Sequence, residues 1–336
     1  MNKTNRTRYF VITAVLVTAV GLGTGLVAYY SVGHQLGALA GRDGPAELRY
    51  VPRDAAVLAY ADVREIMASE VHQRMRRAVP ASQSGQRQFL EQTGIDIESD
   101  IDHVVAYLVP HAGGSTAGLV LARGRFSDVK IEALMREHGA HVEDYGGKRL
   151  IVAATGPRPM AEGLSLSFLE PGLVAVGTAQ MVRRAIDLRN NRDDITKNSE
   201  FMGMLRSVDQ SHAWVVGQFD ALRADWRLPA EISGRLPAIT WFSLSARVDS
   251  SVTGLVRADS RDEEAAKNLG DVIRGFLALA RLQAGSRPAF RALTESLQLG
   301  GTGKSLTLSF SVPGEVFDAI AGMHPGGPAD SAQPAH

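Results

Sequence analysis

One segment near the N-terminus restricts what this chain can fold into more than any other. Residues 10–40 contain no Asp, Glu, Lys or Arg, and the stretch that begins at Phe10 and ends at Tyr30 is almost wholly apolar. As a helix, its 21 residues would span roughly 31 Å, close to the hydrocarbon thickness of a bilayer at about 30 Å. We therefore interpret residues 10–30 as a transmembrane anchor with its ends at Phe10 and Tyr30.

Charge predicts the orientation of this anchor. Residues 1–9 carry Lys3, Arg6 and Arg8 and no acidic residue. Basic flanks remain in the cytoplasm, so we expect a cytoplasmic tail at 1–9, one pass through the inner membrane and an extracytoplasmic C-terminal domain. The chain has 36 basic and 36 acidic residues. Without the three basic residues of the tail, a slight acidic excess remains, which argues against nucleic acid as a partner.

Two alternatives concern the same segment. Ala38 and Ala40 have the small-x-small spacing of a signal-peptidase site, so cleavage after Ala40 is one reading. The apolar stretch is longer than the usual signal-peptide core of about 7–15 residues, which favours an uncleaved anchor. Gly21 and Gly25 form a G-x-x-x-G pattern that permits a homodimer, although glycine is also common in membrane helices. The anchor's other partner would be membrane lipid.

The chain contains no cysteine, which excludes disulfides, zinc–thiolate sites and cysteine nucleophiles. We assign residues 31–48 to a glycine-rich linker. Residues 49–195 then read as a first α+β half, in which short β-like runs alternate with amphipathic helices. We expect strands at 55–60, 104–109, 117–122, 149–153, 164–168 and 173–176, and helices at 63–78 and 89–93 and after the caps Ser127 and Thr178.

Residues 196–323 repeat a similar order of elements. We expect a helix at 201–208, strands at 213–219, 239–248, 252–258 and 305–312, and a long helix opened by the capping box Ser260 and Glu263. That helix would bury Leu269, Val272, Ile273, Phe276 and Ala280. The run Gly118-Leu119-Val120 returns as Gly254-Leu255-Val256.

The fold class is therefore α+β. We expect a duplicated unit of antiparallel sheet with helices packed on one face, and one continuous α+β domain is the alternative. Residues 324–336 are a Pro/Gly/Ala tail for which we expect disorder.

Linear motifs for chemistry are weak in this chain. The run from Gly300 to Ser305 imitates a phosphate-binding loop, but Gln298 stands where its first glycine belongs and a strand follows it, so we predict a plain turn. His138, His141, Glu143 and Asp144 are more easily read as a solvated helix end than as metal ligands. We assign no catalytic, metal or cofactor residue.

Four residues are candidates for a binding surface. Trp241 and Phe242 begin a strand, and alternation places them on opposite sheet faces. Arg183 and Arg184 give the helix after Thr178 a basic face that suits an anionic lipid or a protein partner. The acidic residues beside them make a solvated face the competing interpretation.

The runs Leu173-Val174-Ala175-Val176-Gly177-Thr178 and Val182-Arg183-Arg184-Ala185-Ile186-Asp187, with the opening Val51-Pro52-Arg53-Asp54-Ala55-Ala56, resemble known sequences. They are similar to uncharacterised bacterial proteins with an N-terminal anchor and a repeated α+β ectodomain. The resemblance covers most of residues 50–320 and implies no catalytic residue.

We expect a non-enzymatic envelope protein whose ectodomain binds or scaffolds a protein, lipid or glycan. The alternatives are a periplasmic lipid-binding module and a hydrolase or transferase without a linear motif. A deep apolar cavity would favour the lipid carrier, a cleft with converging acid–base groups the enzyme, and a shallow surface the binding protein.

Overall fold

The computed structural model describes residues 44–78, 90, 94–110, 116–153, 164–208, 210–220, 239–284 and 288–321. The predicted anchor at 10–30 with Gly21 and Gly25, the cleavage site at Ala40, the C-terminal tail and nearly all of the short helix predicted at 89–93 lie outside these residues. Within the described ranges, no helix is both long enough and apolar enough to span a bilayer.

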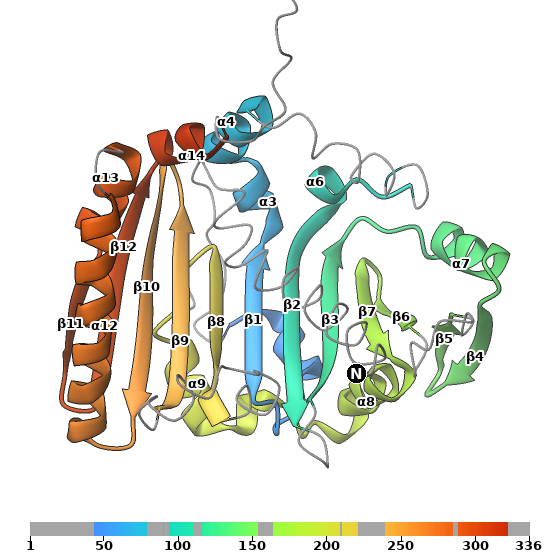
Figure 1. The fold of residues 1–336 in the computed structure, drawn as a ribbon. Helices are drawn as coiled ribbons and strands as arrows, with labels where there is room; N and C mark the ends of the chain where they lie inside the picture. The colour runs from blue at the N-terminus through green and yellow to red at the C-terminus, as the bar shows by residue number, and fades with distance from the viewer. Residues whose placement is uncertain are drawn as a thin grey trace, which may run out of the picture.

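The described strands form one antiparallel sheet (Figure 1). Its order is β11-β12-β10-β9-β8-β1-β2-β3-β7-β6-β5-β4. β1 (Val57–Asp62) and β8 (Ala213–Gln218) pair side by side in the middle, with Ala59 opposite Val215. The two predicted halves therefore contribute to a single sheet and do not form separate ones.

Both wings of the sheet start with a hairpin beside the central pair. A further antiparallel strand then pairs with the second strand of each hairpin, β7 with β3 and β12 with β10. One wing contains β2 (Ile101–Pro110), β3 (Thr116–Gly124), β7 (Leu173–Thr178), β6 (Leu164–Glu170), β5 (Lys148–Val152) and β4 (His141–Tyr145). The other contains β9 (Ile239–Val248), β10 (Ser251–Ser260), β12 (Ser305–Pro313) and β11 (Gln298–Thr302).

Helices, of which α12 is the longest among the described residues, connect the strands. They are the 3-10 helices η2 (Ala46–Tyr50) and η4 (Ile195–Lys197) and the α-helices α3 (Val63–Met67), α4 (Glu70–Ala78), α6 (Ile97–Asp100), α7 (Asp128–Glu137), α8 (Ala179–Asn191), α9 (Ser199–Leu205), α12 (Glu263–Ala284), α13 (Pro288–Ser296) and α14 (Gly314–Ala321).

Two predicted helix caps are confirmed. Ser127 accepts a hydrogen bond from the Lys130 amide, and Thr178 from the Met181 amide, each at 3.3 Å.

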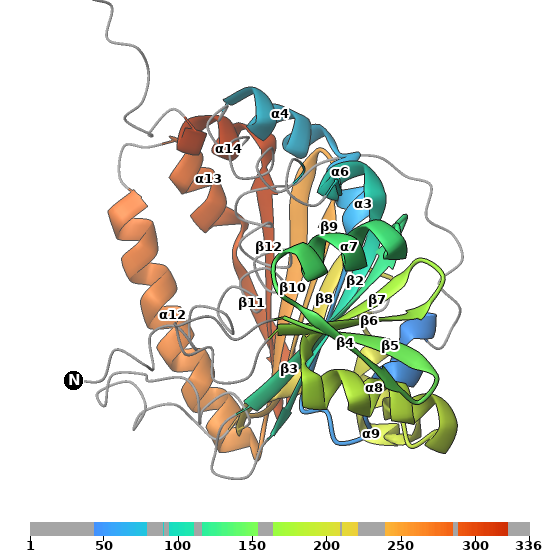
Figure 2. The same ribbon diagram turned by 90° about the vertical axis from the view of Figure 1, so that its right-hand side faces the viewer.

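Helices cover both faces of the sheet, so the prediction that they pack on one face is wrong. Leu150 and Ile151 are neighbours on β5 and point to opposite faces. Leu150 packs in one cluster with Val182 of α8, whereas Ile151 packs in another with Ile131 of α7. Figure 2 shows α7 and α8 on the two sides of these strands. A strand that buries consecutive residues needs a cover on each side.

The largest core cluster spans both halves of the chain. It joins Leu58 and Tyr107 from the first half to Phe201, Trp214 and Trp241 from the second. All five are buried, and Trp214 is completely enclosed. Burial of this size is the main source of folding free energy, so the cluster ties the halves together through their interiors as well as through strand pairing.

Several local predictions differ from the structure. The strands β4 and β11 are not among the predicted ones, and the sequence of β4 favours a helix end and a loop. The helix predicted at 63–78 is divided into α3 and α4. η2 belongs to the folded part, although its first residues were assigned to the linker. The Ser260 capping box is replaced by Asp262, whose Oδ1 accepts a hydrogen bond from the Ala265 amide at 2.8 Å. Ser260 is the last residue of β10 and is buried.

The long helix also packs differently from the prediction. Leu269 of α12 is buried, but Val272 and Phe276 of the expected core stripe are exposed. The apolar side of α12 is broader than the surface that the sheet offers it.

Candidate functional site

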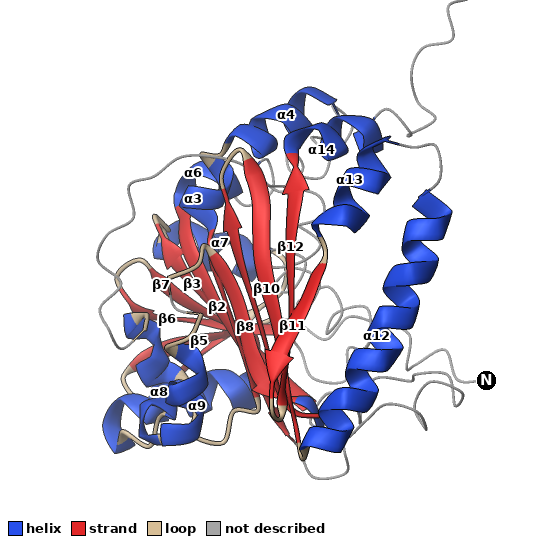
Figure 3. Cartoon of the chain, turned by 90° about the vertical axis from the view of Figure 1, so that its left-hand side faces the viewer, coloured by secondary structure: helices blue, strands red, loops and turns tan. Residues whose placement is uncertain are grey.

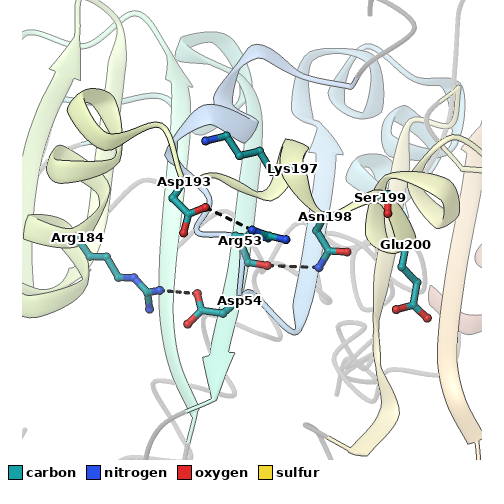
Figure 4. A pocket seen from close by; sticks show the side chains of 8 residues that line it. All are labelled: Arg53, Asp54, Arg184, Asp193, Lys197, Asn198, Ser199 and Glu200. Carbon is teal, nitrogen blue, oxygen red and sulfur yellow. Dashed lines mark hydrogen bonds and ion pairs between the residues drawn. The ribbon is translucent and has the colours of Figure 1, made fainter.

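A shallow polar pocket of about 560 Å³ lies where the entry into β1 meets α8, η4 and α9 (Figure 4). Its lining is charged or polar throughout and consists of Arg53, Asp54, Arg184, Asp193, Lys197, Asn198, Ser199 and Glu200. Three of these side chains are cationic and three are anionic. The pocket is thus electrically balanced and wide open to solvent, which suits contact with a polar surface better than enclosure of a small apolar molecule.

Ion pairs within the pocket hold its two arginines. Arg184 pairs with Asp54, and Arg53 Nη1 lies 3.9 Å from Asp193 Oδ1. The backbone of the same segment is also held, because the Arg53 amide donates to the Asp193 carbonyl at 3.2 Å. Lys197 forms no ion pair with any residue that the structure describes. As far as the described residues show, it is therefore the cation of the pocket that is available to a ligand.

The far side of the pocket is built on the start of α9. Asn198 caps this helix by accepting a hydrogen bond from the Phe201 amide at 3.1 Å, and its Nδ2 donates to the Arg53 carbonyl at 3.4 Å. Glu200 accepts a hydrogen bond from Trp241 Nε1 at 2.8 Å. A helix start that is hydrogen-bonded in this way presents its polar side chains in one geometry.

Two of the four predicted surface residues belong to this region. Arg184 lines the pocket directly, and Trp241 is connected to the pocket by its hydrogen bond to Glu200. Trp241 is buried, however, with its ring packed edge-on against Phe201 at 5.6 Å between centroids, so its indole supports the pocket and does not form its surface.

The other two predicted residues lie elsewhere. Phe242 packs on the opposite face of the sheet beside Val215, which confirms the predicted alternation with Trp241. Arg183 pairs with Glu143 at 2.5 Å and lies over the Tyr145 ring. It thereby fastens α8 to β4.

A second polar cluster sits among η2, β2, β3 and the end of β6. Glu47, only 3% exposed, pairs with Arg123 Nη2 at 2.7 Å and lies 3.1 Å from His103 Nε2. Arg123 also contacts Glu170 at 3.3 Å. Glu170 in turn accepts a hydrogen bond from the Tyr50 hydroxyl at 2.7 Å. The cluster joins four segments that are far apart in the sequence.

The pKa values of two residues of this cluster, Glu47 and Tyr50, lie far from neutrality. Burial alone would raise the pKa of Glu47, but the hydrogen bonds and charges of His103 and Arg123 outweigh it and lower the pKa to about 2. Burial and then the bond to Glu170 raise the pKa of Tyr50 to about 12. A general acid or base needs a pKa near the working pH, so these groups act as permanent structural partners.

No local sequence signal pointed to either cluster. Glu47, Asp54 and Asp193 are ordinary acidic residues of η2 and of irregular segments. The partners of Asp54 and Asp193 lie 130 and 140 residues away along the chain, at Arg184 and Arg53. The cap role of Asn198 was readable from its position before a helix. The pocket itself depends on tertiary contacts.

The remaining motifs have structural roles. Within the run from Gly300 to Ser305, Gly303 and Lys304 form the tight turn between β11 and β12, which confirms the predicted turn before a strand. Gly300 and Gly301 belong to β11, a strand that was not predicted. His141 lies in β4, 3.1 Å from Glu143. In the part of the chain that the structure describes, no three His, Asp or Glu side chains gather as metal ligands.

No known protein family, curated protein or solved structure matches this chain. The resemblance noted from the sequence therefore stays a prediction, and function has to be inferred from the geometry.

Proposed function

We propose that this chain is a single-pass inner-membrane protein whose extracytoplasmic domain binds another component of the envelope and is not an enzyme. The shallow, charge-balanced pocket around Lys197 is the observation that carries the binding role. Its open shape and its charges suit a polar partner surface, in particular a protein segment with a carboxylate that meets Lys197.

The alternatives receive less support. A lipid carrier needs an apolar cavity, whereas the pocket around Lys197 has a charged and polar lining. A hydrolase or transferase needs a group with a pKa near neutrality. The pKa values of Glu47 and Tyr50 are instead both shifted away from neutrality, to about 2 and about 12.

We also infer that the ectodomain arose by internal duplication. The order of elements supports this inference, because β1, the hairpin β2–β3 and α7 correspond to β8, the hairpin β9–β10 and α12. Gly118 and Gly254 take equivalent places on the second strand of each hairpin. A duplicated unit that pairs through its first strands explains why β1 and β8 are neighbours.

The proposed orientation is tested by labelling single cysteines, since the chain has none of its own. A membrane-impermeant maleimide applied to spheroplasts should modify Val129→Cys, whose side chain is exposed on α7, but not Lys3→Cys. Both variants should react after lysis. Protection of position 129 until lysis would overturn the orientation.

The binding role is tested by reversing the charge of Lys197. Partners would be cross-linked to the full chain in its native membrane and quantified after purification. We expect Lys197→Glu to reduce recovery of the partner about fivefold or more, because it places like charges opposite each other. Lys130→Glu on α7 is the matched control and should leave recovery unchanged. Equal recovery with both variants would contradict a role for the pocket.

A further inference from the structure

The long helix α12 carries an exposed apolar stripe. Large exposed hydrophobic side chains are few in the described part of the chain, and half of them lie on this one helix. They are Val272, Phe276, Leu279 and Leu282, with exposed fractions of 41%, 65%, 50% and 79%. Their spacing of three and four residues places them on the same side of the helix, so they form one continuous strip, which we call the α12 stripe.

The stripe is not the surface by which α12 packs on the sheet. That contact uses Ala266 and Leu269, which are buried, and Gly270, which lies close to Leu306 of β12. In Figure 3, α12 is the outermost element on its side of the sheet. The stripe therefore faces outward, next to the packed side.

The charged side chains of α12 do not belong to the stripe. Arg274 projects from another side of the helix and pairs with Asp271 at 2.6 Å. Arg281 is turned toward α13 and the residue after it, where it donates to the carbonyls of Thr294 and Leu297. The helix as a whole has as many acidic as basic residues. Electrostatic attraction to a charged partner therefore contributes little to binding at this helix, and the stripe would bind through apolar contact.

We propose that the α12 stripe rests on the surface of the bilayer that residues 10–30 cross. This inference depends on the membrane anchor of the proposed function. Residues 31–43 separate that span from the described domain and reach roughly 45 Å when fully extended. The tether joins the domain at Gly44, close to Leu48 of η2 and Leu205 of α9. A tether of this length keeps the whole domain near the membrane and raises the effective concentration of its surface there, so a modest apolar contact through α12 is sufficient. Phe and Leu are the side chains that enter the acyl boundary of such interfacial helices.

A second copy of the chain is a weaker candidate for the occupant. A stable protein interface buries about 800 Å² on each partner. Four side chains that are partly buried already fall short of this area. A tethered contact with lipid has no such minimum.

The test uses the full chain reconstituted in phosphatidylcholine vesicles. Leu279→Cys is labelled with a polarity-sensitive fluorophore, and the vesicles contain lipids with a quencher on the acyl chain. Arg274→Cys, about 140° around the same helix, is the matched control. We expect the label at position 279 to be blue-shifted and quenched several-fold more strongly than the label at position 274.

A second variant separates docking from chance proximity. With the label at Val272→Cys, the pair Phe276→Gln and Leu282→Gln should lower the ratio of docked to free helix about tenfold, because two apolar side chains lose their transfer into lipid. All these positions are exposed, so folding should be preserved.

Any of the following results would overturn the inference. Equal quenching at positions 279 and 274 would exclude docking. A blue shift without lipid quenching would mean that protein covers the stripe, either a second copy or the chain itself. Release of the chain from vesicles by alkaline carbonate would show that the anchor, and with it the proposed function, is wrong. Retention without quenching would reject the docking alone.

Discussion

At the scale of single residues, Glu47 has the most consequential environment in the described part of the chain. It is a buried carboxylate, and Arg123 and His103 hold it in the ionised form. Removing one partner of such a pair leaves the other charge poorly compensated. Arg123 keeps its contact with Glu170, which limits the damage.

We expect Glu47→Gln to lower the free energy of unfolding by about 2 kcal/mol at neutral pH. Urea unfolding of the full chain in detergent measures this loss. Glu137→Gln, at an exposed position on α7, is the control and should change stability by less than about 0.5 kcal/mol. Equal effects of the two substitutions would mean that the cluster contributes nothing.

The same residue predicts an acid dependence. The folded pKa of Glu47 lies near 2, below its ordinary value of 4.5. Its stabilisation is therefore complete above the unfolded pKa and is lost as the pH falls from 4.5 toward 2. Across this window the unfolding free energy of the natural chain should fall more steeply than that of Glu47→Gln. Parallel curves would contradict the assignment.

At the scale of elements, the glycine run from Gly300 to Ser305 shows how a motif can mislead. It reads like a phosphate loop, but it is the end of β11 followed by the turn of the β11–β12 hairpin. Gly301 has a φ of +122°, and a Cβ there would lie 2.2 Å from the Ser305 carbonyl oxygen. This backbone conformation, and not a bound ligand, explains why glycine occupies position 301.

We expect Gly301→Ala to destabilise the protein by about 2 kcal/mol or more, because it adds backbone strain and a steric clash. Gly300→Ala is the matched control, since its Cβ would meet only Thr307 Oγ1, at 3.2 Å. Thermal unfolding compares the two variants. The interpretation fails if both have the same effect.

At the scale of the whole molecule, the central pair β1–β8 and the shared core make the two halves one folding unit. Leu58 and Trp214 belong to different halves but to the same buried cluster. Because the sheet is continuous through β1 and β8, it has no boundary at which the two halves could unfold separately. We therefore expect cooperative unfolding.

The tryptophans of the chain lie in residues 196–323, so their fluorescence reports on the second half. Leu150→Ala removes a completely buried side chain in the first half and should cost about 3 kcal/mol. If the halves are one unit, the fluorescence transition in urea shifts as far as the far-UV circular dichroism transition. A fluorescence transition that does not move would show that the halves unfold independently.

The sequence by itself determined the local elements of this protein. Ser127 and Thr178 cap helices as expected, both hairpins beside the central strands were readable, and Trp241 and Phe242 alternate between faces. These features depend on residues close together in the chain, where periodicity and capping chemistry act directly. The two edge strands were not predicted, because the polar sequence of β4 and the glycine-rich sequence of β11 both resemble loops.

Only the tertiary structure decided how these elements combine. The fusion of both halves into one sheet, the covering of both its faces, the exposure of the α12 stripe and the partners of Glu47 and Arg184 all follow from contacts between distant residues. An apolar pattern in the sequence predicts that a side chain will be buried, but it does not indicate which surface of the protein will cover that side chain. That choice depends on which faces meet when the whole chain packs, and so the pocket became visible only in three dimensions.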